Sequence, residues 1–498
     1  MLPRKSIKPK GHWVIDGKLA HSQGLRVGKF LFISGQVDLD IQANVTFPGD
    51  LDKQTRIAMD YVAAVLADAG LDFADLVQLR VFYVNTGKVR ERELAALIGA
   101  CIGPMHSPGP VLAMVPLEAL AFPGMLIEIE GIAMRDENGC VLPRTAAWDP
   151  DCPLLPPPFV HAVRVGEMIF TSGITAEDRN GKIRSKDSLL QQSLIVLPRL
   201  DGLLRQLGAD LQDTVKTMLF NAEPGKKVDW REPALARARH YREPGPAATG
   251  ISVPRLNPDG IMLTNDVIAM RGVDGARLPR QHVWPANHWD WPVHLPYRHG
   301  IRCGDLLFFG GQVPLAPTSD LLHKGDLVKQ TKQVMDYVER ILGGFGLGFE
   351  NVVRVNSYYV GEASKETLLL NARARFERFI VPGPTSTGVP VPYLAYEGML
   401  TEIDFIADFA GPLPALVIMA MLGVPKAELA KVKRMSDDMA LFIGSSRMSQ
   451  DKYDIAERAT KEMAGFFREL IEDRRLFRLA AEARHHVDTH WERGHPRP

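Results

Sequence analysis

The stretch FLFISGQVDLD, beginning at Phe30, recurs twice along the chain, as MIFTSGITAED from Met168 and as LLFFGGQVPLA from Leu306. Each copy has a small residue at the same place before the glycine, and these three are spaced 138 residues apart: Ser34, Ser172 and Gly310. A fixed period of this size is typical of tandem structural units.

Three further markers keep the same register. A glutamine stands 20 residues after each small residue, a glycine 36 residues after it, and a PGP triplet follows later. They are Gln54, Gln192 and Gln330, then Gly70, Gly208 and Gly346, and finally the triplets at Pro108, Pro244 and Pro382. We therefore infer three copies of one module.

One copy is enough to predict the architecture. Apolar and β-branched runs predict strands over 26–36, 76–84, 111–117 and 124–134. Residues 52–69 carry apolar side chains at helical spacing before Gly70, where a glycine is expected to end the helix, and a second helix is predicted over 93–103. The order is that of an α+β fold, β-α-β-α-β-β, with both helices free to cover one face of a sheet.

Composition limits the class of protein. Lys plus Arg and Asp plus Glu both number 59, so the chain lacks the strong positive charge typical of nucleic-acid binders. The four cysteines form no CxxC pair, and we expect neither a metal nor another cofactor. The first residues contain no apolar signal region, and the most apolar run, 409–424, is short for a membrane span. We expect a cytoplasmic protein that binds neither membrane nor nucleic acid.

The ordered motifs SGQ, the Q-T helix start, AGxxxxDLV and the closing IEIE stretch resemble the RidA family, also called YjgF or L-PSP. The resemblance implies chorismate-mutase-like modules over 12–140, 150–275 and 288–411. Family members form trimers with a ligand cleft at each subunit boundary. The resemblance therefore implies that these three modules close into an intramolecular pseudo-trimer, and we expect a monomer.

The resemblance also assigns site positions. A family arginine that pairs with a substrate carboxylate corresponds to Leu112, Ala248 and Ser386, so it is absent from all three copies. A last-strand glutamate that positions water corresponds to Glu128, Thr264 and Glu402. The family's tyrosine corresponds to His21, Phe159 and Tyr297, and its serine to Ser34, Ser172 and Gly310.

On this basis we predict Glu128 and Glu402 as catalytic residues. The predicted ligand-binding residues are His21, Ser34, Tyr297 and Ser386. Module 2 lacks both the glutamate and the arginine, so we interpret it as structural. Glu128 and Glu130 alternate along one strand, and we expect one to face inward and the other outward. The three helix-start glutamines are expected to bond backbone groups.

The tail, 412–498, is predicted to be helical. Its FAGPLPALVIMAMLGVP stretch resembles part of a bacterial cytochrome P-450. No cysteine follows Cys303, so the tail lacks the thiolate that would bind haem. The simplest interpretation is a fragment left by gene fusion.

Two functions remain open. One is a deaminase-like hydrolase acting on a small imine, enamine or related carbonyl compound in clefts between modules. The alternative is a non-catalytic small-molecule-binding or scaffold protein associated with a cytochrome P-450 pathway. RNA cleavage, suggested by one family name, has no support in the residues.

Overall fold

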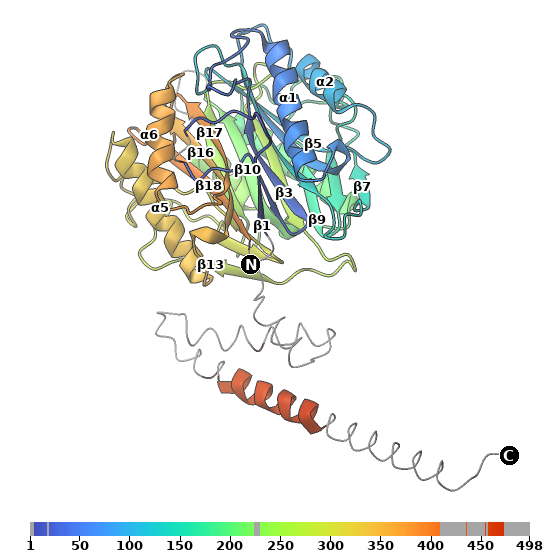
Figure 1. Ribbon diagram of the computed structural model, residues 1–498, viewed down its shortest axis with the longest axis vertical. Coiled ribbons are helices and arrows are strands. Elements are labelled where there is room, and N and C mark those ends of the chain that lie inside the picture. The colour runs from blue at the N-terminus through green and yellow to red at the C-terminus, as the bar shows by residue number, and fades with distance from the viewer. Residues whose placement is uncertain are drawn as a thin grey trace, which may run out of the picture. The chain divides into compact units, whose positions relative to one another are not determined.

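The computed structural model describes residues 4–16, 19–223, 230–408, 435, 454 and 457–472. Residues 2–409 form one compact unit, in which helices lie at the periphery and strands converge at the centre (Figure 1). Residues 457–472 are helical, as expected for the tail, and Phe466 packs in a small apolar cluster with Met435. The remainder of the predicted cytochrome P-450-like stretch lies outside the described residues.

The three modules share one sequence of elements. Module 1 contains β1 (Arg4–Ile7), β2 (Gly24–Val27), β3 (Phe30–Gln36), α1 (Leu51–Asp68), β4 (Leu76–Val84), α2 (Glu91–Ile102), β5 (Val111–Leu117) and β6 (Ile127–Met134). Module 2 contains β7 (Arg144–Ala147), β8 (Ala162–Val165), β9 (Met168–Thr171), α3 (Leu189–Gln206), β10 (Thr214–Ala222), α4 (Arg231–Ala238), β11 (Ala247–Val253) and β12 (Leu263–Met270). Module 3 contains β13 (Arg280–Val283), β14 (Gly300–Cys303), β15 (Leu306–Phe309), α5 (Leu327–Gly344), β16 (Val352–Val360), α6 (Lys365–Phe376), β17 (Thr385–Val391) and β18 (Thr401–Asp408).

Each module forms a six-stranded mixed sheet. In module 1 the order is β1-β2-β3-β6-β4-β5, and only β4 and β5 run parallel. The strand predicted over 26–36 is two strands, because the chain turns between them at Gly28, whose φ is +54°. Each sheet also gains an outer strand that precedes the expected start of its module. The α+β prediction is otherwise confirmed.

Local signals set the long helix of every module. Its N-cap side chain accepts a hydrogen bond from the backbone N–H three residues later: Asp50 from Lys53, Ser188 from Gln191 and Asp326 from Lys329. The predicted terminal glycines follow, with φ of +73°, +79° and +70° at Gly70, Gly208 and Gly346. The same caps in three copies fix the same helix length.

The helix-start glutamines bond backbone groups, as expected. Gln54 Nε2 donates to the carbonyls of Phe47 and Gly124, both at 2.7 Å, and its Oε1 accepts from the N–H of Leu126 at 2.7 Å. Gln192 and Gln330 make the equivalent three bonds in their own modules. Each buried amide thereby joins a helix to the last strand of its sheet.

The three modules close into a ring. A first-strand arginine in each module donates to backbone carbonyls of the preceding one: Arg144 to Leu76, Arg280 to Thr214, and Arg4 to Glu350. Arg4 also pairs with Asp408, the last residue of β18. Module 1 therefore contacts module 3 as directly as it contacts module 2, which gives the internal pseudo-three-fold arrangement.

A ring of buried ion pairs lies where the sheets meet. In each pair a base of one module meets an acid of the next: Arg80 with Asp266 (2.7 Å), Lys216 with Asp404 (2.5 Å) and Arg354 with Glu130. Three bases balance three acids, so no net charge is buried. Because the pairs are not identical, they also distinguish the three boundaries.

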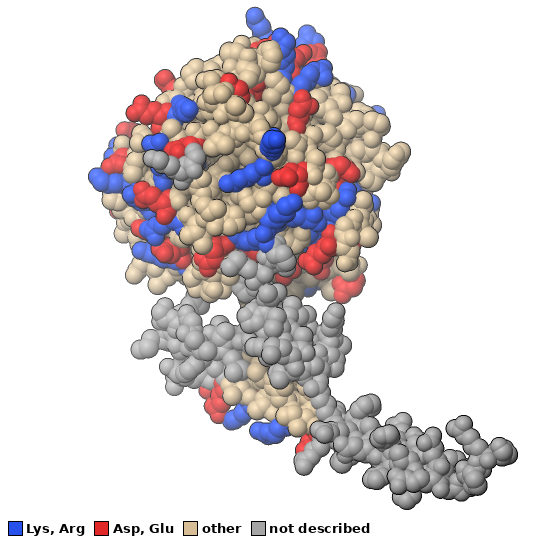
Figure 2. Space-filling view, viewed as in Figure 1, with Lys and Arg blue, Asp and Glu red and all other residues tan. Residues whose placement is uncertain are grey.

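The surface carries both signs of charge. Figure 2 shows Lys and Arg interspersed with Asp and Glu over the face in view, in keeping with the balanced totals. Among the described helices, none is long and apolar enough to cross a membrane.

Candidate active site between modules 1 and 3

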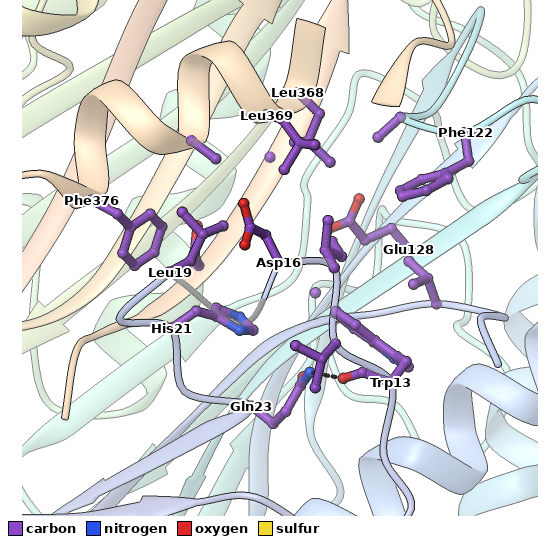
Figure 3. A pocket seen from close by; sticks show the side chains of 18 of the residues that line it. Trp13, Asp16, Leu19, His21, Gln23, Phe122, Glu128, Leu368, Leu369 and Phe376 are labelled. Atoms are coloured by element: carbon purple, nitrogen blue, oxygen red, sulfur yellow. Dashed lines mark hydrogen bonds between the residues drawn. The ribbon is translucent and has the colours of Figure 1, made fainter. Parts of the chain in front are cut away.

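A cavity of about 180 Å³, cavity A, lies at the boundary of modules 1 and 3. Module 1 contributes its N-terminal segment, β3 and β6, and module 3 contributes α6 and β17. In Figure 3, Trp13, His21 and Glu128 of module 1 lie across from Leu368, Leu369 and Phe376 of α6. The cavity is therefore mostly apolar, with a few polar groups at fixed places, as in ordinary small-molecule sites.

Glu128, on β6, lies against the backbone of the neighbouring strand. A Cβ added to Gly35 would be 1.9 Å from Glu128 Oε1, so only glycine leaves room for the carboxylate. The backbone N–H of Gly388, from module 3, donates to the same side chain. Burial, with a smaller effect from the charge of Glu130, raises the pKa of Glu128 to about 8. Near neutral pH the group can therefore both give and take a proton.

Arg375, on α6, brings a cation into the same cavity. Its side chain is buried, and its Nη1 donates to Ser386 Oγ at 3.1 Å. Burial lowers the pKa of Arg375 to about 10, although nearby Tyr359 acts in the opposite direction, so the guanidinium stays charged at neutral pH. Its Nε makes no hydrogen bond within the part of the chain that the structure describes. A guanidinium in an apolar cavity suits a planar carboxylate.

His21 and Ser34 form a fixed polar edge of the cavity. Ser34 Oγ donates to the carbonyl of Ser22 at 2.6 Å and accepts from the N–H of Ser386 at 3.0 Å. Since a hydroxyl has one proton, His21 Nε2 is the donor in its 3.1 Å contact with Ser34 Oγ. Burial, and then the charge of Lys8, lowers the pKa of His21 to about 3, so the imidazole is neutral. Ser34 therefore positions His21 and Ser386 rather than facing the ligand itself.

Boundary B, between modules 2 and 3, also has a buried glutamate and a buried arginine. Glu402 lies against Gly311, where an added Cβ would be 2.1 Å from Oε1, and burial raises its pKa to about 8. Module 2 supplies Arg237, which is buried on α4 and donates to Ser193 Oγ at 2.9 Å. Arg237 also donates to the hydroxyl of Tyr297, a residue that packs with Leu295 at this boundary. The Arg237 guanidinium that a ligand would need is thus already hydrogen-bonded to Tyr297.

Boundary C, between modules 1 and 2, has neither group. Its glutamate position is Thr264, as predicted. The buried positions Ile98, Gly99 and Ile102 of α2 match Arg237, Ala238 and Tyr241 in module 2, which puts an isoleucine in the arginine's place. Glu128 and Arg375 of the preceding module thus line one cavity, Glu402 and Arg237 belong to the two modules of boundary B, and the boundary without the glutamate also lacks the arginine.

Several predicted residues come together in cavity A. Glu128, His21 and Ser386 line it, with Ser34 directly behind, whereas Glu402 and Tyr297 belong to boundary B. The position expected for the arginine holds none, yet the cations come from the second helix. Their signal was present: Arg237 and Arg375 each precede the first proline of PGP by seven residues.

One interpretation needs correction. Glu128 and Glu130 do not face opposite sides, because residues two apart on a strand share a face. Both are buried, Glu128 at cavity A and Glu130 in the ion-pair ring. The interpretation of module 2 as structural stays a prediction, and its Arg237 donates to Tyr297 of module 3.

Comparison with known proteins gives the lineage. A RutC family protein from Pyrococcus horikoshii is 36% identical over 63 residues, 13% of this chain and 50% of that protein, so the chain spans about half the length of this relative. The crystal structure of Rv2704 from Mycobacterium tuberculosis, a member of the YjgF/YER057c/UK114 family, is 26% identical and covers 27% of this chain and all of its own, with a TM-score of 0.22. A putative cytochrome P450 from Bacillus subtilis is 36% identical over 83 residues, 15% of this chain and 19% of that protein, and the assignment of the tail stays a prediction.

The family model described as Endoribonuclease L-PSP matches three times, at residues 15–135, 154–269 and 291–409. Each match covers one sheet apart from its first strand, and together the matches span well over half of the sequence. The chain therefore belongs to the endoribonuclease L-PSP family, the RidA family of the sequence resemblance, as three tandem modules.

Proposed function

We propose that cavity A hydrolyses a small enamine or imine that carries a carboxylate, forming a 2-oxo acid and ammonia. One observation carries the proposal: Glu128 of module 1 and Arg375 of module 3 line the same buried cavity. The first is a proton-transfer group with a raised pKa, and the second is a carboxylate-binding group.

Binding follows from the cation and its neighbour. The Arg375 guanidinium and the Ser386 hydroxyl, already bonded to each other, would hold the substrate carboxylate. The rest of the substrate would lie against Trp13, Phe122 and Phe376, which favours an apolar side chain over a charged one. Orientation by this pair would bring the C=N carbon toward Glu128.

The chemistry needs one group that first gives a proton and then takes one. Protonated Glu128 would give its proton to the carbon of an enamine, which forms the iminium. The resulting carboxylate would take a proton from water as the water oxygen bonds to the iminium carbon. Glu128 then returns this proton to the amine nitrogen, so that cleavage of the C–N bond releases ammonia. The carbinol O–H proton passes back to Glu128 as the carbinol oxygen becomes the ketone. With a pKa of about 8, Glu128 is suited to both steps.

Boundary B is the weaker candidate. It has the same acid and base in Glu402 and Arg237, but Tyr297 already accepts a hydrogen bond from the guanidinium. We therefore place the principal activity in cavity A.

The test measures 2-oxo acid and ammonia from 2-imino acids generated in place by an amino-acid oxidase. The whole chain should accelerate release above the spontaneous rate, Glu128→Gln should abolish most of the acceleration, and Glu402→Gln should retain most of it. A ligand that binds cavity A without any acceleration would instead support the non-catalytic binding function. Equal activity of Glu128→Gln and the unaltered protein would exclude the proposed role.

A further inference from the structure

Boundary C holds a larger cavity than cavity A. Cavity C measures about 450 Å³ and is lined by α2 and β5 of module 1 and by the loops of module 2. Its walls are mainly apolar, and they include Ala95, Leu112, Met114, Ile174, Leu256 and Ile261. The loss of the glutamate and arginine pair has therefore left an open space, not a filled one.

Two carboxylates line this cavity from opposite modules. Glu91 begins α2, and its Oε2 accepts from the Tyr83 hydroxyl at 2.7 Å. Glu177 lies in a loop of module 2, where its Oε2 accepts from the Thr175 hydroxyl at 3.3 Å. Burial, and also the charge of Glu177, raises the pKa of Glu91 to about 8 although it lies at a helix N-terminus. Both carboxylates thus line one cavity, and the charge of one acts on the other.

Neither carboxylate has a counterpart at the other boundaries. Glu177 pairs with Ile183 in an isolated bridge, and the same bridge joins Leu39 to Val45 in module 1 and Leu315 to Leu321 in module 3. Leu39 and Leu315, which stand in the place of Glu177, are fully buried. By the burial pattern of the second helix, the place of Glu91 is taken by Leu368 on α6. Boundary C has therefore exchanged its charges: the acid and base of the family site are replaced by Thr264 and Ile98, and two apolar positions have become acidic.

The cations near cavity C act on Glu177 and not on Glu91. Burial raises the pKa of Glu177, and the charges of Arg199 and Arg92 partly oppose that rise. The pKa of Glu91 is lowered only by the hydrogen bond from Tyr83. Arg90 and Arg92 are exposed, and the guanidinium of Arg90 pairs with Glu93 at 3.3 Å. His161 uses both ring nitrogens for backbone groups, since Nδ1 accepts from Asp149 at 3.0 Å and Nε2 donates to Pro153 at 2.9 Å. That pattern leaves the imidazole neutral. Desolvating the half-buried Glu91 carboxylate is costly unless a positive group joins it.

We propose that cavity C binds a small protonated amine with an apolar body, its ammonium group held between Glu91 and Glu177. The ammonium would supply the positive charge that Glu91 lacks, and the hydrocarbon part would lie on Met114, Leu256 and Ile261. An ammonium has donors for both carboxylates at once. The opposite charge preference separates this site from cavity A, where Arg375 selects anions.

Calorimetric titration of the whole protein tests the charge preference. Phenethylamine, phenethyl alcohol and 3-phenylpropanoate have similar size and differ in the sign of their charge. We expect the amine to bind more tightly than the alcohol by about tenfold or more, and the acid to bind no better than the alcohol. Equal binding of amine and alcohol, or absence of amine binding up to about 10 mM, would overturn the proposal.

Variants locate the site. Glu91→Gln and Glu177→Gln should each weaken amine binding by about tenfold or more, because each removes one charge at nearly constant shape. Glu93→Gln is the matched control on the same helix, since Glu93 is exposed and pairs with Arg90, and it should bind as the unaltered protein does. Glu128→Gln should also keep amine affinity, so failure of the activity proposed for cavity A would not be confused with failure here. Unchanged affinity in Glu91→Gln/Glu177→Gln would refute the assignment.

Discussion

Replacing Gly35 by alanine moves Glu128 without changing its chemistry. The added Cβ would be 1.9 Å from Glu128 Oε1 and 2.7 Å from the carboxylate carbon. Carbon atoms in proteins stay more than about 3 Å from such neighbours, so the carboxylate must retreat by more than about 1 Å in a closely packed interior. The φ of Gly35 lies outside the left-handed region, so alanine acts through this contact and not through the backbone.

The size of the effect follows from the displacement. A shift of about 1 Å in a reacting group costs on the order of 100-fold in rate. That factor corresponds to about 2.7 kcal/mol of activation free energy. Overpacking also lowers stability by about 1–3 kcal/mol, so thermal unfolding has to be measured beside activity. We expect kcat/KM for imine hydrolysis to fall by about 100-fold in Gly35→Ala while the protein stays folded.

The repeat provides two matched controls. In Gly173→Ala the new Cβ would be 2.7 Å from Thr264 Oγ1 at boundary C, and in Gly311→Ala it would be 2.1 Å from Glu402 Oε1 at boundary B. Both variants impose a similar packing cost away from cavity A and should keep most of the activity. Full activity in Gly35→Ala, or an equal loss in all three variants, would contradict the placement of the reaction at Glu128.

Three further outcomes are expected. Arg375→Met should weaken binding of a 2-oxo acid to cavity A by about tenfold or more, measured by calorimetry, whereas Arg237→Met should leave it unchanged. Glu128 binds its proton more tightly in the folded chain, with a pKa of about 8 against 4.5 for an exposed glutamate, so its contribution to stability is full below pH 4.5 and lost as pH rises through 8. Glu128→Gln should accordingly raise the melting temperature more above pH 8 than below pH 4.5, and an equal shift at both would contradict the raised pKa. Lys216→Met should cost about 3–5 kcal/mol in urea unfolding by leaving Asp404 unpaired, and Lys216→Met/Asp404→Leu should recover most of that loss; no recovery would mean that the ion pair is not the cause.

The repeat made the fold predictable from the sequence. Signals such as the N-cap Asp50, the glycine at position 70 and the Gln54 amide act within one module, over contacts that follow from local geometry. The boundary between β2 and β3 was missed because apolar residues continue across the turn at Gly28. Turn conformation is set by one glycine φ there, not by the hydrophobic pattern.

The candidate site was only half predictable. Glu128, His21 and Ser386, predicted from their family positions, line cavity A. Arg375 was missed because it reaches the cavity from helix α6, whereas the family's arginine position is on a strand. A guanidinium can reach the same point in a cavity from a helix or from a strand. Alignment of sequence positions compares residues on the same element, so it does not show that two different elements can place a guanidinium at the same point.

The ring also decides what the losses mean. In a trimer of identical chains, one substitution changes all three sites, but here each site takes its glutamate from one module and its arginine from the module before. Thr264 replaces the glutamate of module 2, and Ile98 replaces the arginine of module 1. If each site took both groups from one module, these two replacements would affect two different sites. Because both substitutions fall at boundary C, cavity A keeps Glu128 and Arg375, and boundary B keeps Glu402 and Arg237. At boundary C the cavity is lined instead by Glu91 and Glu177, where we propose the opposite charge preference. Three modules joined in one chain can differ in this way from boundary to boundary, which three identical subunits cannot do.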